Sequence, residues 1–207
     1  MISRRFVAAA ALALSLAVGV AFALPTPASV ARAEDTPQAA DGTYTVDPVH
    51  SSLMFKIKHL NTSWFYGRFA DVSGKVTYSA ATPEKSSVEF DVKTASVDTF
   101  NDGRNKHVRS GDFFDVAQFP AATFKSTKVA KGGRGLMVTG DLTLHGVKKE
   151  VTIDAALVGG GKGKGGGALA GFDGQLTLKR SDFGMKTMLD ALGDEVTVLV
   201  SIEAAKE

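Results

Sequence analysis

The fold is decided by residues 140–153, GDLTLHGVKKEVTI, in which apolar and polar side chains alternate on both sides of a short polar connection. Leu142 and Leu144 share one face of the segment before the connection, and Val151 and Ile153 share one face of the segment after it. The connection itself, which contains a glycine, predicts the turn of a β-hairpin. We therefore expect two antiparallel strands here, each with one face in a hydrophobic interior.

The same period-two alternation recurs along most of the chain. Many short alternating strands with polar turns indicate an all-β barrel or sandwich, and closure into a barrel would remove the free sheet edges. Periodicity alone does not separate these two architectures. The further apolar faces comprise Leu53, Phe55 and Ile57; Val72, Val76 and Tyr78; Val88, Phe90 and Val92; Phe172, Leu176 and Leu178; and Val196, Val198, Val200 and Ile202.

Three segments interrupt the alternation. Residues 61–66 and residues 101–110 are expected to form short helices, the second with Asn101 as its N-cap. Residues 159–167, GGGKGKGGG, are of low complexity and are expected to form the flexible tip of an elongated hairpin. No Walker or dinucleotide-binding spacing accompanies these glycines, so a nucleotide site is not expected.

One segment, residues 96–127, combines cationic and aromatic side chains. Arg104 and His107, with a lysine and an arginine beside them, precede a cluster of phenylalanines that begins at Phe113. An anion-compatible end next to a large apolar surface suits an amphiphile. For this segment taken alone, a solvated basic loop capped by ordinary core phenylalanines is the favoured interpretation.

Composition excludes several classes of protein. The chain has 207 residues and no cysteine, which excludes disulfides, thiol catalysis and lipid attachment at cysteine. Removal of residues 1–33 would leave 21 basic and 22 acidic residues, a balance unlike that of a nucleic-acid-binding protein. The 13 phenylalanines outnumber 3 tyrosines and 1 tryptophan, so most aromatic area carries no polar group. The length after residue 33 fits one domain.

The amino-terminal segment has the pattern of a secretory signal peptide. Arg4 and Arg5 precede an apolar run that ends at Leu24, and residues 31–33, ARA, have the small-x-small form of a cleavage site. We expect cleavage after Ala33 and a flexible lead-in over residues 34–42. A permanent membrane anchor is the competing interpretation, but the run is mostly alanine. The position of the arginines favours Sec over Tat export.

No catalytic or metal motif is evident in the sequence. The four histidines, at positions 50, 59, 107 and 145, lie on separate segments without the close pairing of a zinc motif. His59 falls on the apolar face of its strand and His145 in a turn, where a structural role is expected. No nucleophile elbow is present. The acids at positions 98, 102, 112 and 115 are expected to pair with Arg104, Lys106 and Arg109 around a rim, although spacing alone does not exclude a glycosidase-like acid pair.

Five separated segments resemble the YceI-like family. They are YTVDPVHSSLMFKIKHL from Tyr44, the segment at residues 96–127, GDLTLHGVKKEVTI from Gly140, GFDGQLTLKRSDFGM from Gly171, and LGDEVTVLVSIEA, which ends at Ala204. The resemblance implies that residues 43–207 form a lipocalin-like antiparallel barrel, all-β with one or two short helices. It further implies a periplasmic or secreted protein that sequesters or carries a polyisoprenoid or a similar long-chain lipid.

From the resemblance and the strand alternation we predict a binding protein without catalysis, cofactor or metal. An isoprenoid quinone fits the ligand class, transient contact with a membrane surface is compatible with it, and nucleic acid is not. A lipid-modifying hydrolase or isomerase on the same barrel, or a protein-binding stress or adhesion module, are the alternatives. The lipid's identity and the oligomeric state stay open. The predicted pocket lining is Leu53, Phe55, Ile57, Phe90, Val92, Phe113, Phe114, Phe124, Leu142, Leu144, Leu176 and Leu178, and the predicted polar mouth is Arg104, His107 and Arg180.

Overall fold

The computed structural model describes residues 38–207, so the expected signal peptide, residues 1–33, and residues 34–37 of the lead-in lie outside the described residues. Strands make up most of the described part, with one α-helix and three short 3₁₀ helices. The elements are β1 (Gly42–Val46), β2 (Ser52–His59), β3 (Ser63–Phe69), β4 (Val72–Tyr78), η1 (Pro83–Lys85), β5 (Ser87–Lys93), η2 (Thr94–Ser96), β6 (Val97–Asp98), α1 (Asp102–Arg109), β7 (Ala121–Gly132), β8 (Gly135–Leu144), β9 (Val147–Lys162), β10 (Ala168–Lys179), η3 (Arg180–Phe183) and β11 (Leu192–Lys206). No helix in residues 38–207 is long and apolar enough to cross a membrane.

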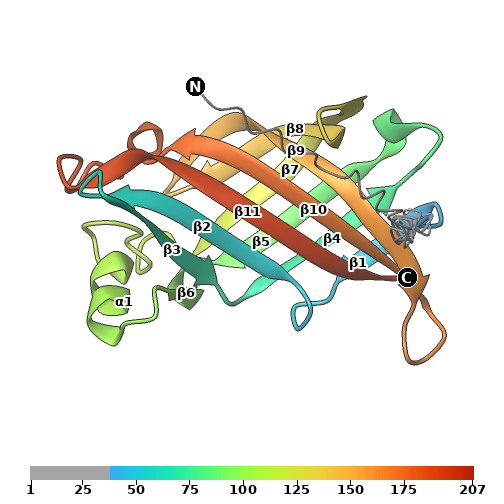
Figure 1. Cartoon of the computed structure of the whole chain (residues 1–207), viewed down its shortest axis with the longest axis horizontal. Coiled ribbons are helices and arrows are strands. Elements are labelled where there is room, and N and C mark those ends of the chain that lie inside the picture. The colour runs from blue at the N-terminus through green and yellow to red at the C-terminus, as the bar shows by residue number, and fades with distance from the viewer. Residues whose placement is uncertain (1–37) are drawn as a thin grey trace, which may run out of the picture. The chain divides into compact units, whose positions relative to one another are not determined.

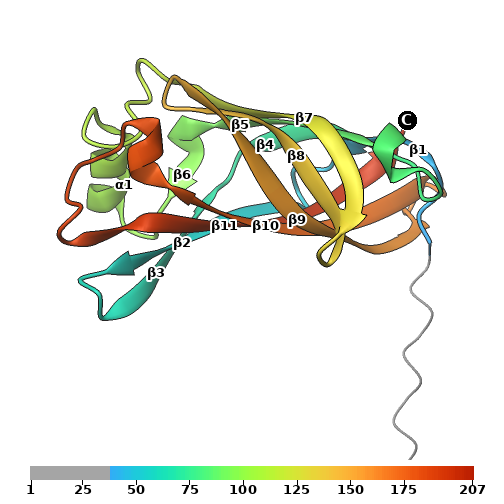
Figure 2. The ribbon, with the colours of Figure 1, turned by 90° about the horizontal axis from the view of Figure 1, so that it is seen from above.

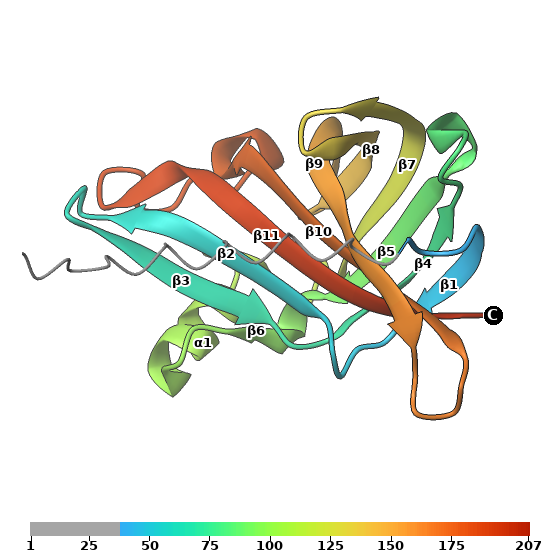
Figure 3. The same ribbon diagram turned by 45° about the vertical axis from the view of Figure 1, so that its right-hand side comes forward.

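Eight of the described strands close into an antiparallel β-barrel (Figure 1, Figure 3). Their order is β1-β4-β5-β7-β8-β9-β10-β11, and pairing of β1 with β11 completes the ring. Each strand of the ring therefore has a partner on both sides, which removes the free edges that an open sheet would expose. The barrel expected from the family resemblance is confirmed, and the sandwich is excluded.

The two ends of the barrel differ because β11 has two neighbours along one edge. Its residues 204–206 pair with β1, whereas its residues 192–201 pair with β2. The β2–β3 hairpin and the short β6 therefore extend from the ring on the same side as α1 (Figure 2). We call this end the α1 end, and the end where β1 completes the ring the β1 end.

The β1 end is closed by tightly packed side chains. Tyr44 and Ala204 are 0% exposed, and the Tyr44 hydroxyl donates a hydrogen bond to the carbonyl of Ala40 at 2.5 Å. The ring of Tyr78 packs edge-on against Phe172, with 5.5 Å between the ring centres. This cluster forms the floor of the barrel interior.

The packed domain begins before the boundary expected from the sequence. Ala39 is only 5% exposed, and Gly42 already belongs to β1. The Asp41 carboxylate accepts hydrogen bonds from the Ser79 hydroxyl at 3.1 Å and from the Ala80 N–H at 2.8 Å. Residues 39–42, expected to be part of a flexible lead-in, are therefore packed against the barrel.

Of the two expected short helices, one is confirmed and one is wrong. The N-cap predicted at Asn101 is present, because its side chain accepts a hydrogen bond from the Arg104 N–H at 2.9 Å at the start of α1. Residues 61–66 instead form a turn and the beginning of β3, with φ of 47° at Leu60 and 52° at Asn61. The alternating aromatic residues that follow favour a strand, and pairing with β2 outweighs the local helix signal.

The hairpin predicted at residues 140–153 is confirmed. Leu144 pairs with Val147, so the turn consists of His145 and Gly146, with φ of 50° and 72°. Two consecutive positive φ values are the geometry that matches the twist of the flanking strands. Nδ1 of His145 lies 3.0 Å from the carbonyl oxygen of Phe183, so this histidine ties the turn to η3.

The glycine-rich insert is shorter as a loop than the sequence suggests. Residues 159–162 belong to β9 and pair with residues 168–171 of β10, which leaves residues 163–167 as the tip. A Cβ atom on Gly160 would lie 2.7 Å from the Cα atom of Ala39. The expectation that all nine residues form a flexible tip is therefore wrong, because Gly160 allows the chain before β1 to approach β9.

This geometry predicts different outcomes for the two halves of the insert. Replacing residues 163–167 with Asn-Gly should leave the melting temperature nearly unchanged, because loop-closure entropy varies slowly with length. Gly160→Val should lower it clearly, because the new side chain would overlap Ala39. Gly165→Val, which has open space around it, is the matched control. Circular dichroism during heating measures these melting temperatures. A clearly lower melting temperature for the shortened-loop variant, or equal melting temperatures for the two valine variants, would contradict this geometry.

Candidate functional site

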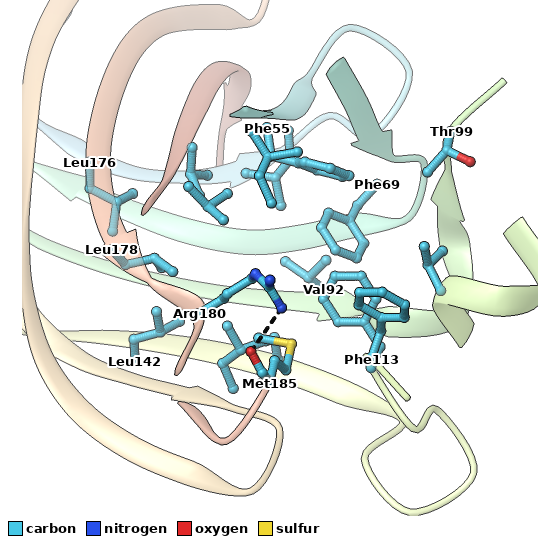
Figure 4. Close-up of a pocket in the computed structure, with 18 of the residues that line it drawn as sticks. Phe55, Phe69, Val92, Thr99, Phe113, Leu142, Leu176, Leu178, Arg180 and Met185 are labelled. Atoms are coloured by element: carbon cyan, nitrogen blue, oxygen red, sulfur yellow. Dashed lines mark hydrogen bonds between the residues drawn. The ribbon is translucent and has the colours of Figure 1, made fainter. Parts of the chain in front are cut away.

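A cavity of about 540 Å³ occupies the barrel between its floor and the α1 end (Figure 4). Its wall is almost wholly apolar, since only six of its 31 lining residues carry a polar side chain. All twelve residues predicted to line a pocket lie on this wall: Leu53, Phe55, Ile57, Phe90, Val92, Phe113, Phe114, Phe124, Leu142, Leu144, Leu176 and Leu178. The alternation of the strands therefore gathers these side chains around one space.

Several inward-pointing side chains are only half-buried because they border this space. Leu53, Phe90 and Leu176 lie on the inner faces of β2, β5 and β10, yet each keeps part of its surface accessible. Barrels of eight strands are just wide enough either to fill themselves with side chains or to hold a small ligand. This barrel leaves its centre unfilled.

Glycines opposite phenylalanines help to keep the space open. Gly67 pairs directly with Phe55 across β3 and β2, and Gly74 pairs with Phe90 across β4 and β5. A Cβ atom on Gly67 would collide with the Phe55 ring, and one on Gly74 would collide with the backbone carbonyl of Glu89 and lie 2.7 Å from the Phe90 ring. The two rings therefore lie along the wall, over the glycines, instead of crossing the lumen.

Aromatic contacts position the segment after α1 against the barrel wall. Phe69 of β3 packs against Phe55, with 5.9 Å between ring centres, and edge-on against Phe114, with 5.4 Å. Phe113, the neighbouring residue, is 9% exposed and also lines the cavity. The basic helix and the aromatic cluster of residues 96–127 thus meet at the open end of the cavity.

Arg104 lies at this end and is exposed to solvent. Its Nη2 donates to the carbonyl of Thr99 at 2.6 Å, and its guanidinium lies 4.4 Å from the ring centre of Phe65. A cation over an aromatic face is a favourable arrangement that leaves the outer guanidinium nitrogens open to an anion. The geometry agrees with a position at the mouth.

Two histidines also border the mouth. His107 lies with Nε2 3.0 Å from Oδ2 of Asp112 and with its ring edge-on to Phe113, at 5.1 Å between centres. His59 ends β2 and lines the cavity, although it is largely exposed. His59 therefore faces the cavity, as its place on the apolar face of the strand predicts, but it lies at the rim. There it adds a third polar side chain to those of Arg104 and His107.

Arg180 does not lie at an exposed mouth, contrary to expectation. It is 4% exposed, and its guanidinium donates to four backbone carbonyls at 2.7–3.0 Å, those of Met185, Thr187, Leu192 and Gly193. Burial lowers the pKa of this guanidinium, an effect that the nearby Asp194 carboxylate opposes. Arg180 is thus a positioning residue that holds the loop between η3 and β11 against the cavity wall.

The acids near the mouth do not pair as the sequence predicted. Asp98 accepts from Phe100 N–H and the Asn105 side chain, which hold the pKa of its carboxyl below the usual value, and Nε of Arg68 lies 3.2 Å away. Arg109 donates to the carbonyl of Val97 at 2.7 Å rather than to a carboxylate. The predicted pairing is wrong because the backbone carbonyls before α1 need donors and the basic side chains supply them.

Sequence reasoning missed part of the wall. Phe65 and Phe69 lie on β3, where the sequence predicts a helix over residues 61–66, and Met185 and Met188 lie in the loop that Arg180 holds. Correct assignment of the alternating aromatic residues of β3 would have placed both phenylalanines inside. The methionines occupy an irregular loop, which carries no periodic signal.

One group of potential metal ligands lies outside the cavity. Asp47, His50 and Glu203 offer ligand atoms within 4.8 Å of one another near the β1 end. The side chain of His50 is 63% exposed, and its hydrogen bond to Asp47 at 2.8 Å raises the histidine pKa. The hydrogen bond itself accounts for this proximity, since it ties the turn after β1 together.

Comparisons with known proteins agree on one family. The sequence pattern of the YceI-like domain matches residues 44–204. A UPF0312 protein of Pseudomonas aeruginosa is 45% identical over 172 residues, covering 82% of this chain and 90% of that protein. The crystal structure of BcnA from Burkholderia cenocepacia is 29% identical with a TM-score of 0.70, covering 77% and 99% of the two chains. A polyisoprenoid-binding domain from Saccharophagus degradans, at 18% identity, a TM-score of 0.58 and coverage of 79% and 98%, shares the fold.

The glycine–phenylalanine pairs predict that a single methyl group can reduce the lumen. In Gly67→Ala the new Cβ meets only the Phe55 ring, so the ring should swing into the cavity. The free energy of unfolding should fall by no more than about 1–3 kcal/mol, while binding of an apolar fluorescent probe should weaken clearly. Adding Phe55→Leu should restore probe binding. Unchanged probe binding in Gly67→Ala would contradict this account of the lumen.

The role assigned to Arg180 predicts a large effect on stability. Arg180→Met would leave four backbone carbonyls without their donor, at about 1–3 kcal/mol for each buried acceptor that finds no new partner. We expect a fall of several kcal/mol in chemical denaturation, against less than about 1 kcal/mol for the exposed control Arg104→Met. Equal free energies of unfolding for the two variants would contradict the positioning role of Arg180.

Proposed function

The chain belongs to the YceI-like domain family, and we propose that it sequesters or carries a polyisoprenoid or a similar long-chain amphiphile inside the barrel. The observation that carries this proposal is the apolar cavity with its polar side chains gathered towards one end. Each methylene group moved from water into such a lumen contributes about 0.8 kcal/mol, so a long chain binds without any specific polar contact. The tail would point to the floor at the β1 end.

The head group of the amphiphile would lie at the α1 end. Arg104, His107 and His59 supply hydrogen-bond donors there, and the charge of Arg104 favours an anionic or carbonyl-bearing head. An isoprenoid quinone or a prenyl phosphate has this chemistry. The description of the Saccharophagus degradans domain as polyisoprenoid-binding supports the ligand class, although at 18% identity it shares the fold alone.

The rival functions need features of a different kind. A hydrolase or isomerase on the same barrel would need an acid, base or nucleophile against the bound chain. In the part of the chain that the structure describes, the lining side chains capable of acid, base or nucleophile chemistry are two histidines and two threonines. Both histidines border the mouth, and the Thr99 hydroxyl donates a hydrogen bond to the Asn105 side chain at 2.6 Å, so this chemistry is not directed at the chain-binding part of the lumen. A purely protein-binding module would need no unfilled interior. Binding without catalysis is therefore the function that the geometry supports best.

We further propose that the protein works in the periplasm or outside the cell. The support is the sequence of residues 1–33, with its paired arginines, apolar run and ARA site. Amino-terminal sequencing of the processed protein should begin at Glu34. Recovery of intact residues 1–24 in the membrane fraction would contradict this location.

Two sets of substitutions separate tail binding from head-group binding. Phe90→Asp should abolish binding of every long-chain ligand, because it places a carboxylate without a partner among hydrocarbon contacts. Val158→Asp, on an exposed position outside the cavity, is the matched control and should bind normally. Titration with a lipid and its headless analogue checks both variants.

Arg104→Ala combined with His107→Ala should act on the head group alone. Ligands with anionic or quinone-like heads should bind about 1–3 kcal/mol more weakly, the typical loss for charge-assisted hydrogen bonds. The headless analogue should bind as before. Equal losses for both ligands would leave the mouth unassigned, and tight binding by Phe90→Asp would refute the lumen as the binding site.

A further inference from the structure

We propose that the exposed apolar face around the cavity mouth docks onto an anionic lipid bilayer. This face, the mouth face, consists of Leu60, Trp64, Tyr66, Phe100, Met188 and Leu189. They are six of the eight large apolar side chains that residues 38–207 leave exposed, with exposed fractions of 43–64%. Large apolar residues gathered on one surface mark an interaction site more often than scattered ones do.

The three segments that carry the mouth face are joined to one another. Leu60 N–H donates to the carbonyl of Ala191 at 2.7 Å, which ties the tip of the β2–β3 hairpin to the loop of Met188 and Leu189. The guanidinium of Arg68 on β3 lies 6.0 Å from the ring centre of Phe100. The hairpin, which projects on the same side of the barrel as α1 in Figure 2, thus adjoins both other segments.

Three of these residues have a left-handed backbone conformation, which is unfavourable for large apolar side chains. Leu60, Phe100 and Met188 have φ of 47°, 61° and 56°. Glycine, asparagine and aspartate tolerate this left-handed region best, whereas large apolar residues are rare in it. Each of these side chains therefore opposes folding twice, through its backbone conformation and through its contact with water. An apolar partner outside the chain explains their presence.

The charges on the hairpin favour a bilayer with anionic lipids. Residues 52–69 include Lys56, Lys58 and Arg68 and no acidic residue. The ammonium groups of Lys56 and Lys58 lie 4.8 and 5.2 Å from the ring centre of Trp64. Tryptophan, tyrosine and lysine side chains together are typical of the membrane interface, where the aromatic ring lies at the head groups and the amine meets lipid phosphates.

The acids beside the mouth face leave this attraction in place. Asp98 pairs with Arg68 at 3.2 Å, whereas neither Lys56 nor Lys58 takes part in the ion pairs that the described residues form. Asp102 and Asp190 lie on the neighbouring segments, and Asp194 and Glu195 lie on β11 beside β2. Asp194 accepts hydrogen bonds from the Ser181 N–H and hydroxyl, and within the described residues Glu195 forms no ion pair with either lysine. Two cations therefore remain for the membrane at the centre of the surface.

Trp64 and Tyr66 alternate with the cavity-lining Phe65 and therefore lie on the outer side of the hairpin. Docking through this face would bring one edge of the cavity mouth to the lipid. Met188 belongs both to the mouth face and to the cavity wall. A hydrocarbon chain could then move between bilayer and barrel without crossing water. This consequence rests on the proposed function, whereas docking itself rests only on the exposed surface.

Trp64 is the only tryptophan of the chain, so its fluorescence reports directly on the mouth face. The processed protein, with its amino terminus verified by mass spectrometry, is mixed with vesicles of phosphatidylcholine alone or with one third phosphatidylglycerol. We expect sedimentation with the anionic vesicles, a blue shift of the emission and at least threefold less quenching by iodide. An unshifted emission, or no sedimentation with the anionic vesicles, would overturn the proposal.

Leu60→Asn with Phe100→Asn gives the sharper test, because asparagine suits the left-handed conformation. This variant should keep or raise the melting temperature and bind vesicles at least tenfold more weakly. Lys56→Gln with Lys58→Gln should abolish only the preference for anionic vesicles. The controls Val49→Thr with Val158→Thr, and Lys128→Gln with Lys131→Gln, lie away from the mouth face and should bind as the parent does.

A lipid probe delivered without vesicles separates the two proposals. The asparagine variant should bind this probe like the parent, so its loss of vesicle binding would concern docking alone. Equal vesicle binding by the asparagine variant and the parent would overturn docking and leave the lumen proposal standing. Shielding of Trp64 that rises with protein concentration, without lipid, would assign the face to a second copy of the chain and also overturn docking.

Discussion

An apolar lumen that its own side chains do not fill is the constraint on which the rest of the structure depends. Side chains that border a space of about 540 Å³ have no partner atoms on one side and therefore lose the dispersion contacts that a filled interior would give. The closed ladder of eight strands tolerates this because its backbone hydrogen bonds do not depend on what lies inside. A bound hydrocarbon chain would restore the missing contacts.

The two ends of the barrel are stabilised by different kinds of interaction. At the β1 end, Tyr44 and Ala204 belong to a packed core that fixes the closure of the ring. At the α1 end, the backbone is irregular, and buried polar groups hold it in place. Arg180 is the main example, since its guanidinium satisfies four carbonyls of a loop that would otherwise have no regular hydrogen-bond partners. The loop at the mouth is thus held in place by a buried cation.

Much of the wall could be predicted from the sequence because strand alternation fixes which side chains face inward. Phe90 and Leu176 are found in the lumen for this reason. The features that were missed depend on contacts between distant segments. Gly160 is in a strand because Ala170 of β10 pairs with it, and residues 63–66 are in a strand because β2 pairs with them. The sequence predicts an exposed position for Arg180 because its carbonyl partners lie up to 13 residues further along the chain and carry no sequence signal.

Mass spectrometry of the protein purified without detergent from its native cells tests the central claim most directly. The account predicts a species heavier than the chain by one long-chain lipid, which organic extraction releases as an isoprenoid or a similar amphiphile, and a lower melting temperature for the extracted protein. A protein recovered at the mass of the bare chain, with the same melting temperature before and after extraction, would contradict the claim that the lumen exists to hold a lipid.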